Sequence, residues 1–335
     1  MSTPHRLVED GVRRWGRLPE RPVVADPLAA YTGLTRHLKR LRLKEWVGFT
    51  LLHPDWYSSL IVQDAHYLAG SEIYAYDRAG GVLHQHAANA PGGSPTLPAE
   101  LLDGVCRFER DGYRIAYAFH APSARHRIEV DIAATPKAPA IRGELELDAG
   151  AATAPLSVSS RLPGGSMYTY KAAFPARGVL RVGDAEIVFD PARDLAVLDE
   201  HRSLLPYRTR WLWGTFATPT GAGPVGANFA ARPELPGEPE ESGLWTPGRC
   251  EPLGDVSFRP DSTDPSAAWH ITSRDGRLDV VFQPEGRKSV KHDLGLFAID
   301  YYQLFGRYRG VLRGTEGDFE IKDVHGVCES MRARL

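Results

Sequence analysis

One stretch of the chain brings together the side chains best suited to moving a proton. It runs from residue 199 to 213 with the sequence DEHRSLLPYRTRWLW. If its start is an extended strand, Asp199 and His201 lie on one face, because successive side chains of a strand point to opposite faces. A carboxylate beside an imidazole, close to apolar rings, can tune a proton donor or acceptor toward neutral pH. The pattern indicates acid–base chemistry, with Asp199 orienting or charging His201; the alternative is a structural ion pair in a tryptophan core.

Aromatic and polar side chains near this stretch are candidates for binding a ligand. Alternation places Tyr207, Trp211 and Trp213 on one strand face. Further along, an asparagine lies in a strand-like run, a glutamate precedes another tryptophan, and a polar–aromatic run approaches the C-terminus. An aromatic interior with a few polar groups is how a small barrel holds one ligand, although it can also simply fill a core. The candidate ligand-binding residues are Tyr207, Trp211, Trp213, Asn228, Glu241, Trp245, Gln303 and Arg307.

Two other patterns are interpreted as structural. The segment GAGPVG at 221–226 matches the dinucleotide fingerprint GxGxxG, but Pro224 removes a backbone donor and no helical periodicity follows, so we expect a loop between two strands. His84 and His86 share a strand face, yet a zinc site needs a further ligand and none is nearby in the sequence. The sequence has no GxSxG, HExxH, P-loop or EF-hand motif. We therefore expect neither a metal nor another cofactor.

Composition narrows the class of protein and of partner. The 335 residues are 42% hydrophobic and 24% charged, with a net charge of −2, as in ordinary globular proteins. A chain with this net charge has no overall positive electrostatic potential that would attract the phosphates of nucleic acid. No apolar run reaches the length of about 18 residues that a transmembrane segment needs, and the first residues do not form a signal peptide, so we expect a cytoplasmic protein. Cys106, Cys250 and Cys328 are widely spaced and indicate free, buried thiols.

The first 45 residues differ from the rest, with ten Lys/Arg against five Asp/Glu. Asp26-Pro27 is a helix N-cap followed by proline at the first helical position. Apolar residues then recur at helical spacing: Leu28, Tyr31, Leu34, Leu38 and Leu41. They predict a helix over 27–41 that packs on the body, preceded by a solvated arm. Docking at a membrane surface is the alternative, disfavoured because Gly33 interrupts the helix and no Trp or Phe anchors it.

The elements that must position the candidate site are strands. From Trp46 onward, short aromatic and β-branched runs are separated by turns, and Asp111-Gly112, Gly183-Asp184 and Asp275-Gly276 are expected hairpin connections. Strands at spacings of about 8–12 residues predict an all-β protein, and two sheets are simpler than one very large sheet. The predicted division is an arm and helix (1–45) and two β-domains (46–165 and 166–335), with the boundary near 163–165.

Several motifs resemble the bacterial family catalogued as domain of unknown function 2804. They are D-x-H-R-x3-P-Y-x3-W-x-W at 199–213, G-x-N at 226–228, E-x2-L-W at 241–245, F-G-R-Y-x-G at 305–310 and Y-T-Y-K at 168–171. That family has no settled activity and is remotely similar to the lipocalin-like superfamily of carotenoid hydratases and tocopherol cyclases. The resemblance implies two tandem lipocalin-like antiparallel β-barrels with a short N-terminal helix, and an apolar substrate near the acidic-His motif.

Residues and resemblance together predict a cofactor-independent enzyme of the hydratase, cyclase or isomerase type acting on a bulky apolar small molecule. Asp199 and His201 would be catalytic and the tryptophans would shape the pocket, while Tyr207, Glu241 and Arg307 would bind a polar end or stabilise developing charge. The alternative is a non-catalytic binding protein for a lipid or isoprenoid-like ligand. A third possibility is that the polar motifs only hold two barrels together. The oligomeric state stays open.

Overall fold

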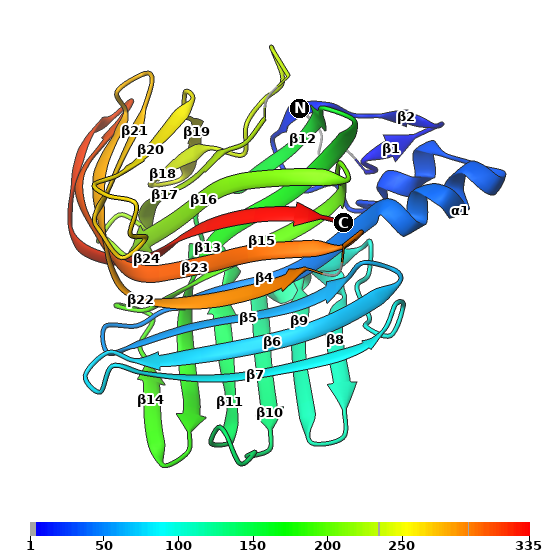
Figure 1. The fold of residues 1–335 in the computed structure, drawn as a ribbon. Helices are drawn as coiled ribbons and strands as arrows, with labels where there is room; N and C mark the ends of the chain where they lie inside the picture. The colour runs from blue at the N-terminus through cyan, green and yellow to red at the C-terminus, as the bar shows by residue number, and fades with distance from the viewer. Residues whose placement is uncertain (1–4, 234, 294) are drawn as a thin grey trace.

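The protein is almost entirely β-structure, as a computed structural model that describes residues 5–233, 235–293 and 295–335 shows (Figure 1). Its N-terminal part contains β1 (Val8–Glu9), β2 (Val12–Arg13), β3 (Gly16–Leu18), the 3-10 helix η1 (Pro27–Ala30) and α1 (Gly33–Arg42). Short 3-10 helices follow later at η2 (Leu101–Asp103), η3 (Ala121–Ser123) and η4 (Ala149–Ala151). Two large antiparallel sheets make up the rest of the described chain.

The first sheet is a nearly closed barrel. Its main strands are β4 (Leu43–Leu52), β5 (Trp56–Asp64), β6 (Leu68–Asp77), β7 (Val82–Pro91), β8 (Val105–Arg110), β9 (Tyr113–His120), β10 (Arg125–Ile132), β11 (Ile141–Asp148), β12 (Leu156–Leu162), β13 (Gly165–Val182), β14 (Ala185–Phe189) and β15 (Leu195–Leu204). They are hydrogen-bonded in the order β7-β6-β5-β4-β15-β13-β11-β10-β9-β8, with β12 and β14 on β13 and β3 on β12. The strands β4–β7 cross in front of β8–β11 in Figure 1.

The second sheet is a curled half-barrel. It contains β16 (Arg208–Thr218), β17 (Val225–Ala231), β18 (Gly243–Thr246), β19 (Arg249–Pro252), β20 (Val256–Pro260), β21 (Trp269–Ser273), β22 (Leu278–Asp293), β23 (Ala298–Gly314) and β24 (Gly317–Arg334). The order is β19-β18-β17-β16-β24-β23-β22-β21-β20. The strands β22, β23 and β24, of 16 to 18 residues each, are long enough to bend across the outside of the first barrel.

Apolar side chains fill each sheet and the space between them. One cluster around Phe49 and Tyr117 fills the first barrel, and another around Phe216 and Tyr308 fills the second sheet. A third cluster joins the outer face of the first barrel to the second sheet, and it contains Tyr57, Trp213, Trp245 and Phe305. The Tyr57 hydroxyl donates to the carbonyls of Gly306 and Gly326, at 2.5 and 2.9 Å. The two sheets therefore share a continuous buried interface.

The predicted fold class, two tandem lipocalin-like β-barrels with a short N-terminal helix, is confirmed. The three predicted hairpin connections join β8 to β9, β13 to β14 and β21 to β22, and 221–224 is the connection between β16 and β17. Residues 163–164 form the turn of the β12–β13 hairpin, whereas the chain passes from the first sheet to the second at 205–207. The domain limits themselves stay a prediction.

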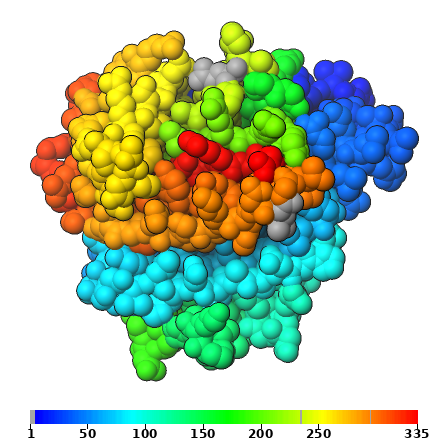
Figure 2. Space-filling model, viewed as in Figure 1, coloured from blue at the N-terminus to red at the C-terminus, as the bar shows by residue number. Residues whose placement is uncertain are grey.

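The helix differs from its prediction in the face that it buries. The Asp26 carboxylate caps η1 by accepting from the Leu28 amide at 2.8 Å, and Leu28 is buried as expected. After a break, α1 exposes its leucines rather than packing them on the body, so the predicted packing is wrong for α1. Figure 2 shows α1, in blue, projecting from the side of the molecule. No helix in the described residues is long and apolar enough to span a membrane.

The basic arm before the helix is held on the body rather than solvated. Buried Arg13 donates to the Ser159 and Ser166 hydroxyls, at 3.0 and 2.8 Å, and to the Met167 carbonyl at 2.6 Å. Further on, Arg21 pairs with Glu200 of β15. These cations find buried partners in β12, β13 and β15, which composition alone does not indicate. Of the predicted free thiols, Cys106 and Cys328 are buried and Cys250 is half-buried.

Candidate functional site

Strand β15 presents Asp199 and His201 on the face that looks toward the second sheet. The register pairs Asp199 with Lys171 of β13 and His201 with Trp46 of β4. Directly opposed residues of antiparallel strands project from the same face, so these four side chains converge. Residues 200 and 202 of β15 point the other way, into the first barrel. The alternation that the sequence predicts is therefore what assembles the cluster.

Lys171 is the centre of this cluster. Its ammonium forms an ion pair with Asp199 and lies 3.4 Å from Glu241 Oε2 and 3.5 Å from His201 Nε2. His201 Nε2 is in turn 3.1 Å from Glu241 Oε2 and 3.6 Å from Asp199 Oδ1. Lys171, His201 and Glu241 are buried, whereas Asp199 is partly exposed. One cation and one imidazole thus share two carboxylates in a largely dry environment.

The charges of the cluster set the pKa values of its members. Burial lowers the pKa of Lys171, but attraction first to Asp199 and then to Glu241 outweighs it and leaves that pKa above its ordinary value. For Glu241, burial raises the pKa, while Lys171 and His201 lower it more, so that it lies well below the usual range. A lysine that stays charged and a glutamate that stays ionised fix the electrostatic surroundings of His201.

Tryptophan rings enclose the cluster. The indole of Trp46 stacks on the His201 imidazole with centroids 4.3 Å apart, and its Nε1 donates to Asp199 Oδ2 at 3.1 Å. The ring of Trp213 lies 4.9 Å from the Lys171 ammonium. Its Nε1 donates to Asn228 Oδ1 at 2.9 Å, and the Asn228 amide donates to the Glu241 carbonyl at 2.6 Å. Asn228 therefore connects the aromatic wall to the segment that carries Glu241.

A second acid, Glu329 of β24, lies on the other side of Trp211. Its carboxylate accepts from Trp211 Nε1 at 2.9 Å, from the Tyr301 hydroxyl at 2.9 Å and from the Gln303 amide at 3.1 Å. Burial raises the pKa of Glu329 above its ordinary value and outweighs these hydrogen bonds, and the charge of Asp199 adds to the increase. The surroundings of Glu329 thus favour its protonated form, as a proton donor requires.

Replacing Glu329 with glutamine should change how stability depends on pH. Because the folded-state pKa of Glu329 is raised, the folded protein holds its proton above about pH 4.3, where the unfolded chain has lost it. The free energy of unfolding of the wild type therefore falls as pH rises through this window. The glutamine of Glu329→Gln cannot titrate. Urea unfolding at a series of pH values should therefore show that the free energy of unfolding of the variant increases relative to that of the wild type as pH rises. Parallel pH profiles for the two proteins would contradict the raised pKa.

Comparison with known proteins identifies the family. The sequence profile of the family described as domain of unknown function (DUF2804) matches residues 10–335, almost the whole chain. The chain belongs to the DUF2804 family. The resemblance stated from the motifs is thereby confirmed. A search of the curated proteins finds no match.

Solved structures with low sequence identity share the fold of this DUF2804 protein. CghA matches with a TM-score of 0.57 at 12% identity, over 88% of each chain. CghA with Sch210972 matches with a TM-score of 0.53 at 12% identity, again over 88% of each chain. A Nitrosomonas europaea protein described as ATTH matches with a TM-score of 0.53 at 13% identity, over 88% of this chain and 93% of that one. At these identities the likeness shows a common fold alone.

The structure of the DUF2804 protein brings most, but not all, of the predicted site residues together. Asp199, His201, Trp211, Trp213, Asn228, Glu241 and Gln303 belong to the two connected clusters. Tyr207 lies apart, exposed, with its hydroxyl donating to the Leu296 carbonyl at 2.5 Å. Arg307 pairs at 2.6 Å with Glu285 near the surface. Trp245 is fully buried in the interface between the sheets. The functional roles given to these residues stay predictions.

The clusters also contain residues that were not predicted as site residues from the sequence, among them Trp46, Lys171, Tyr301 and Glu329. Lys171 is in the Y-T-Y-K motif that the resemblance quotes, and its position opposite Asp199 follows only from the β13–β15 register. Trp46 and Glu329 come from strands far away in the chain. The two histidines of β7 are elsewhere: His86 Nε2 lies 2.7 Å from the Pro139 carbonyl, and His84 stacks on Trp56. Among the described residues no group of three His, Cys, Asp or Glu could hold a metal ion.

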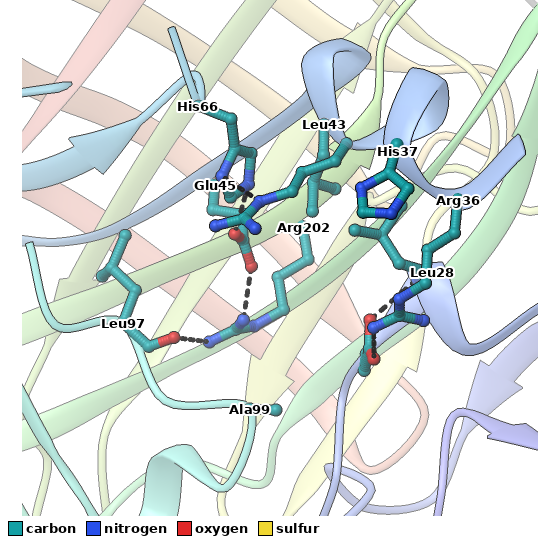
Figure 3. A pocket seen from close by; sticks show the side chains of 11 residues that line it. Leu28, Arg36, His37, Leu43, Glu45, His66, Leu97, Ala99 and Arg202 are labelled. Atoms are coloured by element: carbon teal, nitrogen blue, oxygen red, sulfur yellow. Dashed lines mark hydrogen bonds and ion pairs between the residues drawn. The ribbon is translucent and has the colours of Figure 1, made fainter. Parts of the chain in front are cut away.

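A cavity of about 270 Å³ lies on the opposite face of β15, at the mouth of the first barrel (Figure 3). Its lining mixes charged side chains with the apolar side chains of Leu28, Leu43, Leu97 and Ala99. Arg202 donates to Glu45 and to the Pro98 carbonyl, and Arg36 pairs with Asp26 at 3.0 Å. The cavity is smaller than the roughly 300 Å³ of a typical ligand pocket, and Arg36 and Arg202 already pair with acids, so it is a poor place for a bulky apolar molecule. The His201 cluster and the cavity are separated by the β15 backbone.

Proposed function

We propose that this DUF2804 protein is a cofactor-independent acid–base enzyme of the hydratase, cyclase or isomerase type acting on an apolar small molecule. The observation that carries the proposal is geometric: Glu329, with a raised pKa, accepts a hydrogen bond from Trp211, and the ring of Trp211 lies against Trp46, which stacks on His201 beside Asp199. The surroundings raise the pKa of Glu329 and lower that of Glu241, which contacts His201, and acids whose pKa values are pushed apart are the arrangement that acid and base roles use. Asp199, Trp46, Trp211 and Glu329 are partly rather than fully buried and form the accessible side of the site.

In this proposal Glu329 donates a proton to a carbon–carbon double bond of the substrate. The His201–Asp199 pair then accepts a proton, either from the substrate, which completes an isomerisation or cyclisation, or from an attacking water, which completes a hydration. His201 then releases its proton to solvent and Glu329 takes one up, so that a hydration consumes one water and an isomerisation or cyclisation consumes none. The faces of Trp46 and Trp211 would stabilise the intervening positive charge. Lys171 and Glu241 hold the imidazole in place and are positioning residues.

The fold supports a small-molecule ligand. CghA, which shares it, has been crystallised with Sch210972. In this chain, the aromatic rings around His201 and Glu329 would present apolar surface to such a ligand, and the polar groups between them would orient it. Nothing in the site favours a nucleotide, since the GxGxxG segment is a hairpin connection. We therefore expect the ligand of the site around His201 and Glu329 to be an apolar small molecule.

The test of this proposal begins by identifying a molecule that is bound to the purified protein. Native mass spectrometry of freshly purified protein, followed by organic extraction, should recover a discrete apolar molecule that anchors a turnover assay. In that assay His201→Gln and Glu329→Gln should each lower kcat by about 100-fold, the usual scale for loss of an acid or base. His84→Gln is the matched control, because His84 also stacks on a tryptophan but lies on β7, away from the site. It should keep the wild-type rate.

Two results would oppose the proposal. If the recovered molecule is never converted by the wild type, the site binds a ligand without chemistry, which is the carrier alternative. If the wild type turns the molecule over and both His201→Gln and Glu329→Gln keep full activity, the chemistry takes place elsewhere. Thermal unfolding of each variant separates loss of activity from loss of structure.

A further inference from the structure

The helix α1 is oriented with its apolar stripe away from the protein. Leu34, Leu38 and Leu41 are 74%, 59% and 53% exposed. Polar contacts hold the helix down: on the opposite side Arg36 pairs with Asp26 at 3.0 Å, and at the end of the helix Arg42, beside the stripe, donates to the Gly164 and Leu205 carbonyls at 3.0 Å each. An amphipathic helix normally buries its apolar stripe. Here polar contacts fix the reverse orientation and leave three leucines, spaced i, i+4 and i+7, on an open face of the helix.

Two turns extend this apolar face. The β5–β6 turn exposes Tyr67 and Leu68, and the β22–β23 turn exposes Leu296 and Phe297 at 75% and 47%. The rings of Tyr67 and Phe297 lie 5.6 Å apart, and Lys44, just after α1, lies 4.8 Å from the Tyr67 ring. Both turns lie at the end of the molecule from which α1 projects (Figures 1 and 2). We call the leucines of α1 and these four turn residues the docking face.

The charge of α1 has one sign, whereas Asp293, next to the β22–β23 turn, pairs with Arg334. The sequence of α1, GLTRHLKRLR, carries four cations and no acid, although the whole chain has a net charge of −2. On the helix, Arg42 comes on one side of the leucine stripe and His37 and Arg40 on the other, because residues are spaced about 100° apart. A basic helix with an apolar stripe, accompanied by aromatic side chains, is the composition of segments that lie in a membrane interface.

We propose that the docking face binds the surface of an anionic phospholipid bilayer. The leucines and turn residues would enter the boundary between headgroups and acyl chains, and the flanking cations would pair with lipid phosphates. The shape favours a bilayer over a protein partner. The face is a projecting helix with two turn tips (Figure 2), which a fluid surface can surround, whereas a protein partner would need a matching groove. The tyrosine and phenylalanine supply the anchor that the helix sequence lacks.

Co-sedimentation with vesicles tests the proposal on the full chain. Wild-type protein should bind vesicles of phosphatidylcholine with phosphatidylglycerol, should bind pure phosphatidylcholine at least about tenfold more weakly, and should be released by salt. The variant Leu34→Ser/Leu38→Ser/Leu41→Ser should lose about tenfold or more in affinity for the anionic vesicles. The matched control is Val82→Ser/Val105→Ser/Val188→Ser, which removes three exposed apolar side chains elsewhere and should bind like the wild type.

Each other outcome overturns the proposal. The bilayer is not the occupant if the wild type does not bind anionic vesicles. The same holds if the leucine and valine triple variants bind these vesicles with equal affinity. A wild-type dimer that the leucine variant converts to monomer, with no vesicle binding, assigns the face to a second copy of the chain. If the triple leucine variant does not fold, the single variant Leu38→Cys carrying a polarity-sensitive dye tests the same point. The emission of the dye should shift to the blue with anionic vesicles only.

Discussion

Lys171→Met should lower the free energy of unfolding by about 3–5 kcal/mol, the cost of leaving a buried carboxylate without its cation. The methionine has nearly the shape of the lysine stem, so the change removes charge with little change in packing. It leaves Asp199 and Glu241 as two carboxylates with His201 and Arg232 as their remaining cationic partners. Urea unfolding near neutral pH, with the midpoint and slope fitted together, measures the loss.

The pH dependence of that loss identifies its cause. In the wild type the pKa of Glu241 is lowered, so its stabilising effect is present above the unfolded pKa and disappears as pH falls. Without Lys171 the carboxylate can take up a proton more easily, so the difference in the free energy of unfolding between wild type and variant should narrow as pH falls below about 4.3, the unfolded pKa of a glutamate. Adding Glu241→Gln to Lys171→Met should recover part of the stability, because it removes the unpaired charge.

Lys322→Met is the control for this prediction. Lys322 also pairs with a carboxylate, that of Glu320 at 2.8 Å, but both side chains are mostly exposed. Exposed ion pairs contribute about 0–1 kcal/mol, so the control should unfold close to the wild type. A loss below about 1 kcal/mol for Lys171→Met, no larger than that of an exposed pair, would mean that solvent already screens the cluster.

The sequence was a good guide wherever the information is local. Alternation along 199–213 placed Asp199 and His201 on one face, and Asp-Gly or Gly-Asp pairs marked hairpin turns, because both depend on neighbouring residues. The partners of Asp199 depend on register between strands that are distant in the chain. Lys171 precedes it by 28 positions, and Glu329 belongs to the last strand. A single lysine in an apolar strand gives no sign of the charge that it will meet, so these residues could not be found by spacing.

The orientation of α1 shows a different limit. The spacing of its leucines predicts an amphipathic helix equally well whether the apolar stripe faces the protein or faces away. The decision rests on Asp26, Gly164 and Leu205, which accept hydrogen bonds from the arginines of the helix. Two of these acceptors are backbone carbonyls whose position only the folded chain defines. Amphipathic periodicity therefore establishes that a helix has two faces but leaves open which of them is buried.

Arg21→Met is the second change expected to have a large effect, again a loss of about 3–5 kcal/mol, because it removes the cation that faces a fully buried carboxylate. Arg21 donates to both oxygens of Glu200, at 2.7 and 2.8 Å, and both side chains are almost inaccessible. It also donates to the Ala99 carbonyl at 3.0 Å. The arm, β15 and the segment before η2 thus meet at one guanidinium. Its loss should both destabilise the protein and release the arm to proteases.

Arg14→Met provides the comparison, since Arg14 lies in the same arm but pairs with Glu9 at the surface, where about 0–1 kcal/mol is expected. Glu200 also accepts from Arg202 at 2.8 Å. If that second arginine alone were enough, Arg21→Met would unfold like Arg14→Met, and the arm would stay protected from limited proteolysis. We do not expect this outcome, because Arg202 also pairs with Glu45. Its one buried guanidinium would then have to neutralise the carboxylates of both Glu45 and Glu200. The arm is therefore expected to be part of the cooperative core of the first barrel rather than a separate appendage.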